Sequence, residues 1–348
     1  MSLDSFLVRK RTNEEAFASQ PPPPPPIQKK QPTTHRFEIA DVTLGLARIP
    51  TLKDAATKAR LIVTSPPYYG ARDYTTGTKN KLGTHTTSST TVQKEDDEDG
   101  EADDESDASD AANQLGHEAT PYEYVRRLAR TFHDGSKFLA ADGSLFIVIG
   151  DTFARRNYSD PAGVYRSIRK SEALGVFGML IAEMRAAGWL LWQEIVWSKP
   201  SVPPSGTSQV RCTPSSERIL WFVLSKPHFD NKTVREEGKT KAGTVMPPVG
   251  GKKYADGKEK TMISDGKRCR RDVWEICPSR DKSSHVAPFP SELVEIPILA
   301  CSEVGDIVLD PFGGTLTVQR VARELNRSSM CFDIIDHTGI LNKHKTDE

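Results

Sequence analysis

The residues best placed to do chemistry are a serine, two prolines and a tyrosine that directly follow the apolar run Leu61–Thr64. They read Ser65-Pro66-Pro67-Tyr68. The apolar run is typical of a buried strand, and proline cannot donate to a sheet ladder, so the chain must leave the sheet there. The turn would present a hydroxyl, backbone carbonyls and an aromatic ring at the carboxyl end of a strand, where open α/β sheets bind ligands. These groups suit a planar amide-like or amino-heterocyclic ligand, although a proline-stiffened turn with a core tyrosine would give the same pattern.

A second candidate site lies near the end of the chain, where a strand predicted over 306–309 is followed by the segment 310–315, Asp-Pro-Phe-Gly-Gly-Thr. Glycines at such a turn let backbone amides approach a ligand at a helix N-terminus, as in nucleotide-binding folds. Asp333 ends the next predicted strand, about 23 residues after Asp310, and this position suits hydrogen bonds from a ribose diol. The spacing is generic for adenosine-containing cofactors, and a plain strand-to-helix connection with a capping acid is the alternative.

Strands and helices alternate along the rest of the chain. Thr120 is placed to cap a helix that begins at Pro121, and Glu123 would complete a capping box. The alternation indicates an α/β fold with a mostly parallel central sheet and helices on both faces. The other predicted strands are 36–41, 144–150, 190–197 and 217–224, and the other predicted helices are 44–59, 171–187, 316–326 and one that starts at Ser291.

The formal net charge of zero hides an uneven distribution of charge. Residues 95–110 contain eleven of the 47 acidic side chains, so the rest of the chain carries 36 acidic against 47 basic residues. A basic body with one acidic tract fits a nucleic-acid binder that carries a solvated, self-repelling loop. The length of 348 residues predicts about two domains, or one large α/β unit with insertions.

Composition also separates a core domain from segments of different character. The N-terminal segment contains six consecutive prolines at 21–26 with basic residues on either side. The basic residues are equally consistent with a nuclear-localisation signal and with a solvated tail that has no such role. Between residues 232 and 271, twelve Lys and Arg face five Asp and Glu, which indicates a recognition region. The predicted parts are a disordered tail at 1–34, a core domain at 35–340 with an acidic disordered insertion at 78–113 and a basic, loop-rich recognition region at 226–284, and a tail at 341–348.

Several classes of protein are not expected from this composition. No apolar run reaches the ~20 residues of a membrane helix, and the N-terminus lacks a signal-peptide apolar region, so an intracellular protein is expected. The five cysteines include no Cys-x-x-Cys pair, so neither a metal site nor a disulfide framework is expected.

Taken together, the two candidate sites and the blocks between them resemble the β-class DNA amino-methyltransferases, especially the N4-cytosine type. In that family the catalytic motif precedes the cofactor motif, so the core is circularly permuted. The resemblance implies the Rossmann-like fold of methyltransferases that depend on S-adenosylmethionine. It covers about residues 36–336 in the expected order, through the blocks 64–74, 114–125, 142–151, 188–200, 211–217, 285–293 and the Asp-Pro-Phe-x-Gly turn at 310–314.

The resemblance implies a role for each matching residue. S-adenosylmethionine would lie across the carboxyl edge of the sheet, and a cytosine flipped out of double-stranded DNA would stack on Tyr68. The N4 amine of this base would sit between the Ser65 hydroxyl and the Pro66 carbonyl, within the motif that Pro67 and Tyr68 complete. The residues implied to bind the cofactor are Asp41, Phe289, Ser291, Asp310, Phe312, Gly314, Thr315 and Asp333. Those implied to contact DNA are Arg72, Lys199, Arg211, Arg268, Arg270 and Arg271.

Two alternatives to cytosine methylation remain open on the sequence. Ser65, where a related motif has Asp, favours the N4 of cytosine, and the N6 of adenine is the second choice. A decayed core that binds DNA or chromatin without catalysis is the alternative from another class. Leu316 favours it, because this leucine stands where the cofactor turn usually has a further glycine.

The segments outside the core suggest partners and a location. The acidic insertion would repel DNA phosphates unless it moves away from the DNA or binds a basic partner such as a histone tail. Together with the polyproline tail, it predicts a eukaryotic, nuclear protein that works on chromatin; without a eukaryotic origin, a cytoplasmic protein is expected.

Overall fold

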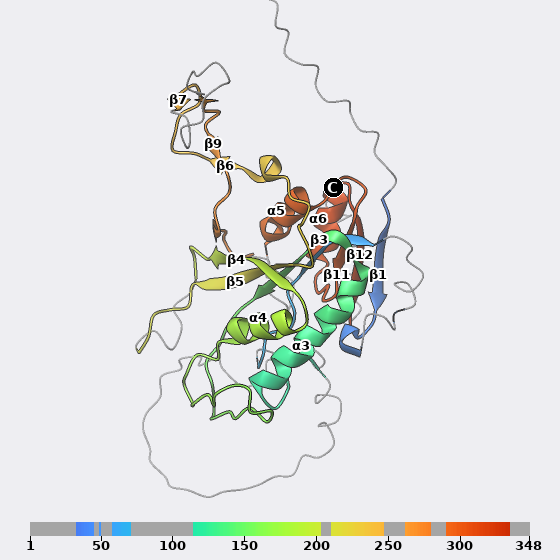
Figure 1. The fold of residues 1–348 in the computed structure, drawn as a ribbon, viewed down its shortest axis with the longest axis vertical. Coiled ribbons are helices and arrows are strands. Elements are labelled where there is room, and N and C mark those ends of the chain that lie inside the picture. The colour runs from blue at the N-terminus through green and yellow to red at the C-terminus, as the bar shows by residue number, and fades with distance from the viewer. Residues whose placement is uncertain are drawn as a thin grey trace, which may run out of the picture. The chain divides into compact units, whose positions relative to one another are not determined.

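The computed structural model describes residues 33–44, 49, 58–70, 114–202, 210–246, 262–279 and 290–334. Within these residues an eight-stranded sheet forms the centre of the fold, in the order β1-β12-β11-β2-β3-β5-β4-β10 (Figure 1). Neighbouring strands from β1 to β3 are parallel, whereas β5 runs antiparallel to both β3 and β4. The predicted mostly parallel sheet is therefore confirmed, with one reversed strand that the sequence did not indicate.

The elements have the following bounds. The strands of the main sheet are β1 (His35–Ile39), β2 (Ala59–Thr64), β3 (Leu139–Ile149), β4 (Leu190–Ser198), β5 (Ser216–Val223), β10 (Val273–Glu275), β11 (Ile307–Asp310) and β12 (Ser328–Asp333). The α-helices are α3 (Pro121–Gly135), α4 (Val176–Ala186), α5 (Ser291–Cys301) and α6 (Thr317–Glu324), and the short 3-10 helices are Val42–Leu44, Ser136–Phe138 and Asn231–Val234. Two small hairpins pair β6 (Glu236–Glu237) with β9 (Lys267–Arg268) and β7 (Val245–Met246) with β8 (Met262–Ile263).

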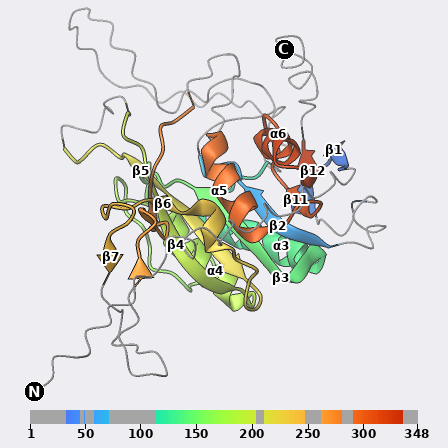
Figure 2. The same ribbon diagram turned by 90° about the horizontal axis from the view of Figure 1, so that it is seen from above.

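Helices cover both faces of the sheet, as Figure 2 shows. Side chains alternate along β2, so that Ile62 packs with Leu128 of α3 in one apolar cluster, while Leu61 packs with Val294 of α5 in the other. All four residues are fully buried. The central strands are thus apolar on both sides, which leaves their carboxyl ends as the place where polar residues can meet a ligand.

Helix α3 starts where its sequence predicts. The Thr120 side chain accepts a hydrogen bond from the Glu123 backbone N–H, the Glu123 side chain accepts one from the Thr120 backbone, and Pro121 occupies the first turn. This capping box is confirmed. It fixes the entry of α3, which carries Tyr124 towards the first candidate site.

The helix predicted over 171–187 is shorter than predicted, because α4 begins only at Val176. Ser171 has a φ of 72° in the left-handed region, which interrupts a helix. Residues 152–174 instead fold back on themselves through isolated bridges between Phe153 and Ala173 and between Tyr158 and Ile168. Backbone hydrogen bonds within this hairpin, 152–174, thus override the local helical pattern.

Three other segments differ from, or lie outside, the predictions. Strand β3 starts at Leu139, before the predicted 144, because Leu139 already pairs with Ala59 of β2. Strand β10 comes from the segment predicted to be loop-rich and joins the edge of the main sheet beside β4. The helix predicted over 44–59 falls mostly outside the described residues; at its start these show the short 3-10 helix Val42–Leu44, and at its end the prediction is wrong, because Ala59 begins strand β2. No helix in the described ranges has the length and apolarity needed to cross a membrane.

Candidate functional site

The two turns singled out in the sequence lie side by side at the carboxyl edge of the sheet. Strands β2 and β11 are parallel neighbours, and β12 lies on the other side of β11. The Thr64 hydroxyl, at the end of β2, donates a hydrogen bond of 2.6 Å to Oδ1 of Asp310, at the end of β11. Both residues are fully buried. This bond fixes the turn at 65–68 against the turn at 310–315.

Asp310 is electrostatically unusual. Its Oδ1 accepts hydrogen bonds from Thr64 and, at 3.1 Å, from the Phe312 backbone N–H, but its buried Oδ2 has no hydrogen-bond partner among the described residues. Burial raises the pKa of the Asp310 carboxyl to about 7, with a smaller contribution from the nearby Asp333 carboxylate. The protein therefore holds an incompletely satisfied carboxyl at the junction of the two turns.

The turn after β11 is arranged to present backbone and carboxylate groups. The Gly314 N–H donates to Oδ2 of Asp333 at 2.7 Å, and the Gly313 N–H donates to the Phe332 carbonyl at 2.7 Å. Gly314 has a φ of 48°, and among the described residues a Cβ placed on it would approach only the Phe312 carbonyl, at 4.0 Å. The turn thus brings Asp333, predicted as a ribose ligand, next to the glycines and leaves space above Gly314.

Two further predicted cofactor residues already have partners. Oδ1 of Asp41, just after β1, accepts hydrogen bonds from the Thr43 N–H at 2.9 Å and the Thr43 hydroxyl at 2.6 Å. The Ser291 hydroxyl, at the start of α5, accepts one from Arg320 at 2.6 Å. Phe312 packs edge-on against Phe132 with ring centroids 6.3 Å apart, and the Thr315 hydroxyl lies 3.2 Å from that of Thr317. Phe289 lies outside the described residues.

The turn at 65–68 is held by contacts from elsewhere in the chain. The Tyr124 hydroxyl of α3 donates to the Pro67 carbonyl at 2.8 Å, and the Gly70 N–H donates to the Gly116 carbonyl at 2.8 Å. Gly116 has a φ of 96°, and a Cβ there would lie 2.9 Å from the Tyr68 carbonyl oxygen. Only glycine therefore fits at 116, and the turn is stiff before any ligand arrives.

Tyr68 is positioned by residues that the sequence did not connect to it. Its hydroxyl donates to Oε2 of Glu217, in β5, at 2.7 Å. Its ring lies against Gly150, where a Cβ would come within 2.7 Å of Cε2 of the ring. Burial, followed by the negative charge of Glu217, raises the pKa of the Tyr68 hydroxyl well above its usual value, so it stays a donor.

Lys199 completes this arrangement. Its ammonium pairs with Oε1 of Glu217 and lies 4.3 Å from the centroid of the Trp197 ring. The sequence assigned Lys199 to DNA contacts, whereas the structure engages it in a partly buried ion pair behind Tyr68. Glu217 itself was visible in the sequence only as the last residue of a matching block.

The other predicted DNA contacts also have partners within the protein. Arg211 donates to the Ser171 carbonyl at 3.1 Å and lies over the Phe153 ring, 4.0 Å from its centroid. Arg268 and Arg271 both pair with Oε1 of Glu236 at 2.9 Å. Arg270 donates to the Val234 carbonyl at 3.0 Å. Arg72 lies outside the described residues.

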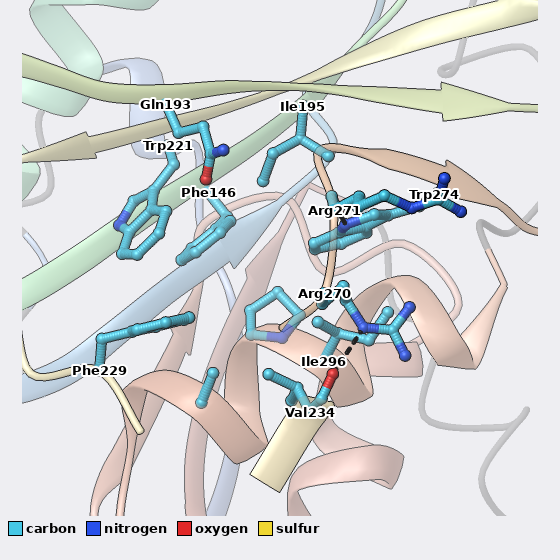
Figure 3. Close-up of a pocket in the computed structure, with 12 residues that line it drawn as sticks. Phe146, Gln193, Ile195, Trp221, Phe229, Val234, Arg270, Arg271, Trp274 and Ile296 are labelled. Carbon is cyan, nitrogen blue, oxygen red and sulfur yellow. Dashed lines mark hydrogen bonds between the residues drawn. The ribbon is translucent and has the colours of Figure 1, made fainter. Parts of the chain in front are cut away.

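A separate pocket lies on the α5 face of the sheet (Figure 3). It is walled by aromatic side chains, with Phe146 and Trp221 stacked at 5.0 Å and Trp221 and Phe229 tilted at 5.2 Å between ring centroids. Arg270 and Arg271 line it, but none of the residues predicted for catalysis or cofactor binding does. The pocket draws on the middle of β3, β4 and β5, away from the edge where the two turns meet.

Comparison with known proteins places this geometry in context. A family model described as DNA methylase, of the N6 and N4 type, matches residues 59–338. The chain is 28% identical over 304 residues to the type II methyltransferase M.Cfr9I of Citrobacter freundii, covering 82% of this chain and 79% of that protein. It is 27% identical over 301 residues to M.SmaI of Serratia marcescens, covering 82% of each. Among solved structures, the cytosine-N4-specific PvuII DNA methyltransferase superposes with a TM-score of 0.52 at 18% identity, over 90% of this chain and 93% of that one, which shows a shared fold.

Proposed function

The chain belongs to the family of DNA methylases that transfer a methyl group from S-adenosylmethionine to an exocyclic amine of a DNA base, and we propose that its target is the N4 amine of cytosine. The fold and the cofactor expected from the sequence are confirmed at the level of the family. The choice of base, the residues that act on it and the way the base is presented belong to this proposal.

The observation that carries the proposal is the hydrogen bond between Thr64 and Asp310. It joins the strand that ends in Ser65-Pro66-Pro67-Tyr68 to the strand that ends in the glycine-rich turn. A base held by the first turn and a cofactor held by the second would therefore be neighbours. This supports direct methyl transfer between them, because holding two reactants in the right geometry removes a large part of the barrier.

The residues of the second turn fit S-adenosylmethionine. The unpartnered, buried Oδ2 of Asp310 suits a ligand that carries positive charge. The space above Gly314 allows close approach to the backbone, and Asp333 can accept hydrogen bonds from ribose hydroxyls. When bound, S-adenosylmethionine supplies a methyl group on a positively charged sulfur.

The first turn can activate an amine without a strong base. An aromatic amine is a poor nucleophile because its lone pair is delocalised into the ring. If the Ser65 hydroxyl and the Pro66 carbonyl accept its two hydrogens, the amine is favoured in its pyramidal form with the lone pair directed away from both. As the new N–CH3 bond forms, the S–CH3 bond would break and the sulfur would leave as a neutral thioether. The amine would then carry the positive charge and afterwards lose a proton to solvent. Tyr68 provides the ring on which the base stacks.

Cytosine N4 is favoured over adenine N6 because the first motif residue is Ser65 rather than an aspartate. The methyltransferase PvuII, which shares the fold, is described as cytosine-N4-specific. Methylation of adenine N6 is the second candidate, since the family includes both types. The proposed substrate is double-stranded DNA. Chromatin as a partner and a nuclear location stay predictions.

The experiment is to incubate the full chain with unmethylated genomic DNA and isotope-labelled S-adenosylmethionine, and to identify modified nucleosides by mass spectrometry. Labelled N4-methylcytosine is the expected product. Labelled N6-methyladenine alone would show that the choice of base is wrong, and no labelled nucleoside would contradict the activity.

The role of Ser65 is tested with Ser65→Ala. Removing one fixed hydrogen-bonding group should lower the methylation rate by about 100-fold, while calorimetry should show unchanged affinity for S-adenosylmethionine. An equal loss of rate and cofactor affinity would contradict the role assigned to this hydroxyl.

A further inference from the structure

The hairpin at 152–174 carries a cluster of exposed cations at the edge where the two turns meet. It follows β3 directly and contains five basic side chains against two acidic ones, Asp160 and Glu172. The basic residues are Arg155, Arg156, Arg166, Arg169 and Lys170, and all five are exposed. Among the described residues, no ion pair involves Arg166, Arg169 or Lys170.

The hairpin is built rigidly. Tyr158 and Ile168 exchange backbone hydrogen bonds of 2.8 and 2.9 Å across it, and Ala154 accepts one of 2.7 Å from Ser171. At its tip, Oδ2 of Asp160 accepts backbone N–H groups from Val164 and Tyr165 at 2.8 and 2.9 Å. Its cations are therefore presented on an ordered scaffold.

The hairpin is also anchored to α3 and to Gly70, just after the first turn. Arg126 of α3 forms a two-pronged ion pair with Asp160, at 2.7 and 2.8 Å, which neutralises the acid nearest the tip. The Tyr122 hydroxyl donates to the Arg166 carbonyl at 2.7 Å. Arg155 donates to the carbonyl of Gly70, two residues after Tyr68, at 3.0 Å. The hairpin thus follows β3 at the same edge of the sheet as the first turn and contacts the chain just after Tyr68.

The cations expected to contact DNA are engaged elsewhere. Lys199 pairs with Glu217, and Arg268 and Arg271 share Glu236. A side chain that already compensates a carboxylate adds little net positive potential. By contrast, the side chains of Arg166, Arg169 and Lys170 form no ion pair with a carboxylate of the described residues. Glu172 accepts a hydrogen bond from the backbone N–H of Arg169, not from its side chain.

We propose that this hairpin is a DNA-backbone clamp, in which Arg166, Arg169 and Lys170 contact phosphates of the strand that flanks the flipped base. The clamp rests on the proposed function, because it assumes that a duplex lies across the carboxyl edge. Contacts to phosphates hold a duplex in register and make binding salt-dependent, but they read no sequence.

The test is the triple variant Arg166→Gln/Arg169→Gln/Lys170→Gln of the full chain. Its binding to a mixed-sequence DNA duplex is measured by fluorescence anisotropy over a range of salt concentrations. Loss of three phosphate contacts should reduce the slope of log K against log salt by about 3 and weaken binding by about tenfold or more at low salt. In methylation assays the KM for DNA should rise, while kcat at saturating DNA stays within about twofold.

The matched control is Lys58→Gln/Arg130→Gln/Arg185→Gln, which removes the same charge from exposed positions just before β2, on α3 and on α4. Lys58 lies at the amino end of β2, and Arg130 and Arg185 lie on the helices that lead into β3 and β4, so the salt slope should not change. A hairpin variant with the wild-type slope, or a control with an equal loss, would overturn the clamp even if the wild type methylates DNA. If the wild-type chain neither binds nor methylates DNA, the proposed function fails together with the clamp.

Discussion

Asp310 joins the two turns of the candidate site. Its Oδ1 ties β11 to β2, while its Oδ2 is buried without a partner in the described structure. A buried carboxylate that lacks a full set of hydrogen bonds destabilises the folded protein, and the cost falls when a cation approaches. The free protein thus keeps a strained electrostatic site where a positively charged cofactor is expected.

The raised pKa of Asp310 predicts how stability depends on pH. The folded form holds the proton more tightly than the unfolded form, with a pKa of about 7 against the usual 3.8. Protonated Asp310 therefore contributes its full share to the free energy of unfolding below about pH 4. This contribution is lost as the pH rises towards 7 and is absent above that. Over this range wild type should lose on the order of 4 kcal/mol relative to Asp310→Asn.

The measurement is the difference in unfolding free energy between wild type and Asp310→Asn, by denaturant titration at several pH values without cofactor. Taking the difference cancels the titration of the other acids. A difference that stays constant between pH 4 and 8 would show that the carboxyl titrates normally.

Glu217 should act on the reaction through Tyr68. Glu217→Ala removes the acceptor of the Tyr68 hydroxyl and the partner of Lys199, so the ring loses its fixed orientation. We expect the single-turnover methylation rate to fall by about 100-fold, with unchanged affinity for S-adenosylmethionine in calorimetry.

A double-mutant cycle with Tyr68→Phe tests whether Glu217 acts by orienting the Tyr68 ring or by stabilising the fold in general. Tyr68→Phe keeps the ring and deletes only the hydroxyl, so the double variant should be little slower than Glu217→Ala alone. Glu217→Gln, which keeps an acceptor for Tyr68, should recover part of the rate. Fully additive effects would mean that Glu217 does not act through this tyrosine.

At the scale of elements, the start of α6 shows how the chain accommodates an unusual residue. Leu316 takes a left-handed conformation with a φ of 60° and is fully buried. Its backbone carbonyl still accepts the first hydrogen bond of α6, from Arg320 at 3.0 Å. The left-handed backbone costs roughly 1–2 kcal/mol, and burial of the side chain offsets it. The side chain packs inside the fold under the turn.

Helix α3 predicts a measurable effect of capping on the site. Thr120→Ala removes the side-chain half of the capping box and should destabilise the protein by about 1 kcal/mol. Because α3 also carries Tyr124 to the Pro67 carbonyl, fraying of its first turn should loosen the catalytic turn as well. The melting temperature and the methylation rate should therefore both decrease.

Thr120→Ser is the matched control, since it keeps the hydroxyl that caps the helix. It should retain nearly the full stability and rate. If Thr120→Ser loses as much stability as Thr120→Ala, the methyl group rather than the cap carries the effect.

At the scale of the whole molecule, charge is divided between segments for which we expect opposite effects on DNA. The hairpin at 152–174 adds exposed cations beside the catalytic turn, whereas residues 95–110 hold eleven acids. The acidic segment lies outside the described residues. Its charge alone predicts repulsion of a duplex wherever the two come within a Debye length.

Deletion of residues 78–113 tests this repulsion. We expect tighter binding to a DNA duplex at low salt, convergence with wild type at high salt because salt screens the interaction, and an unchanged melting temperature. DNA affinity equal to wild type at every salt concentration would show that the insertion does not act on DNA. If the deletion variant also binds basic proteins such as histones as tightly as wild type does, the prediction that the insertion binds a basic partner is wrong.

The sequence by itself determined the family, the two turns and the start of α3. These features are encoded within a few neighbouring residues, such as two prolines after an apolar run or a threonine three residues before a glutamate. Their order along the chain was enough to predict a mostly parallel sheet with both turns at its carboxyl edge.

Only the tertiary structure decided which residues support those turns. Tyr68 and Glu217 are 149 positions apart, and no local pattern links them. The antiparallel direction of β5 and the hairpin at 152–174, which takes the place of the first turns of a predicted helix, also depend on contacts across the fold. The same is true of the ion pairs that Lys199, Arg268 and Arg271 form with carboxylates. A charged side chain has the same sequence signature whether it is compensated or not, and only its neighbours in space decide whether its charge is available to DNA.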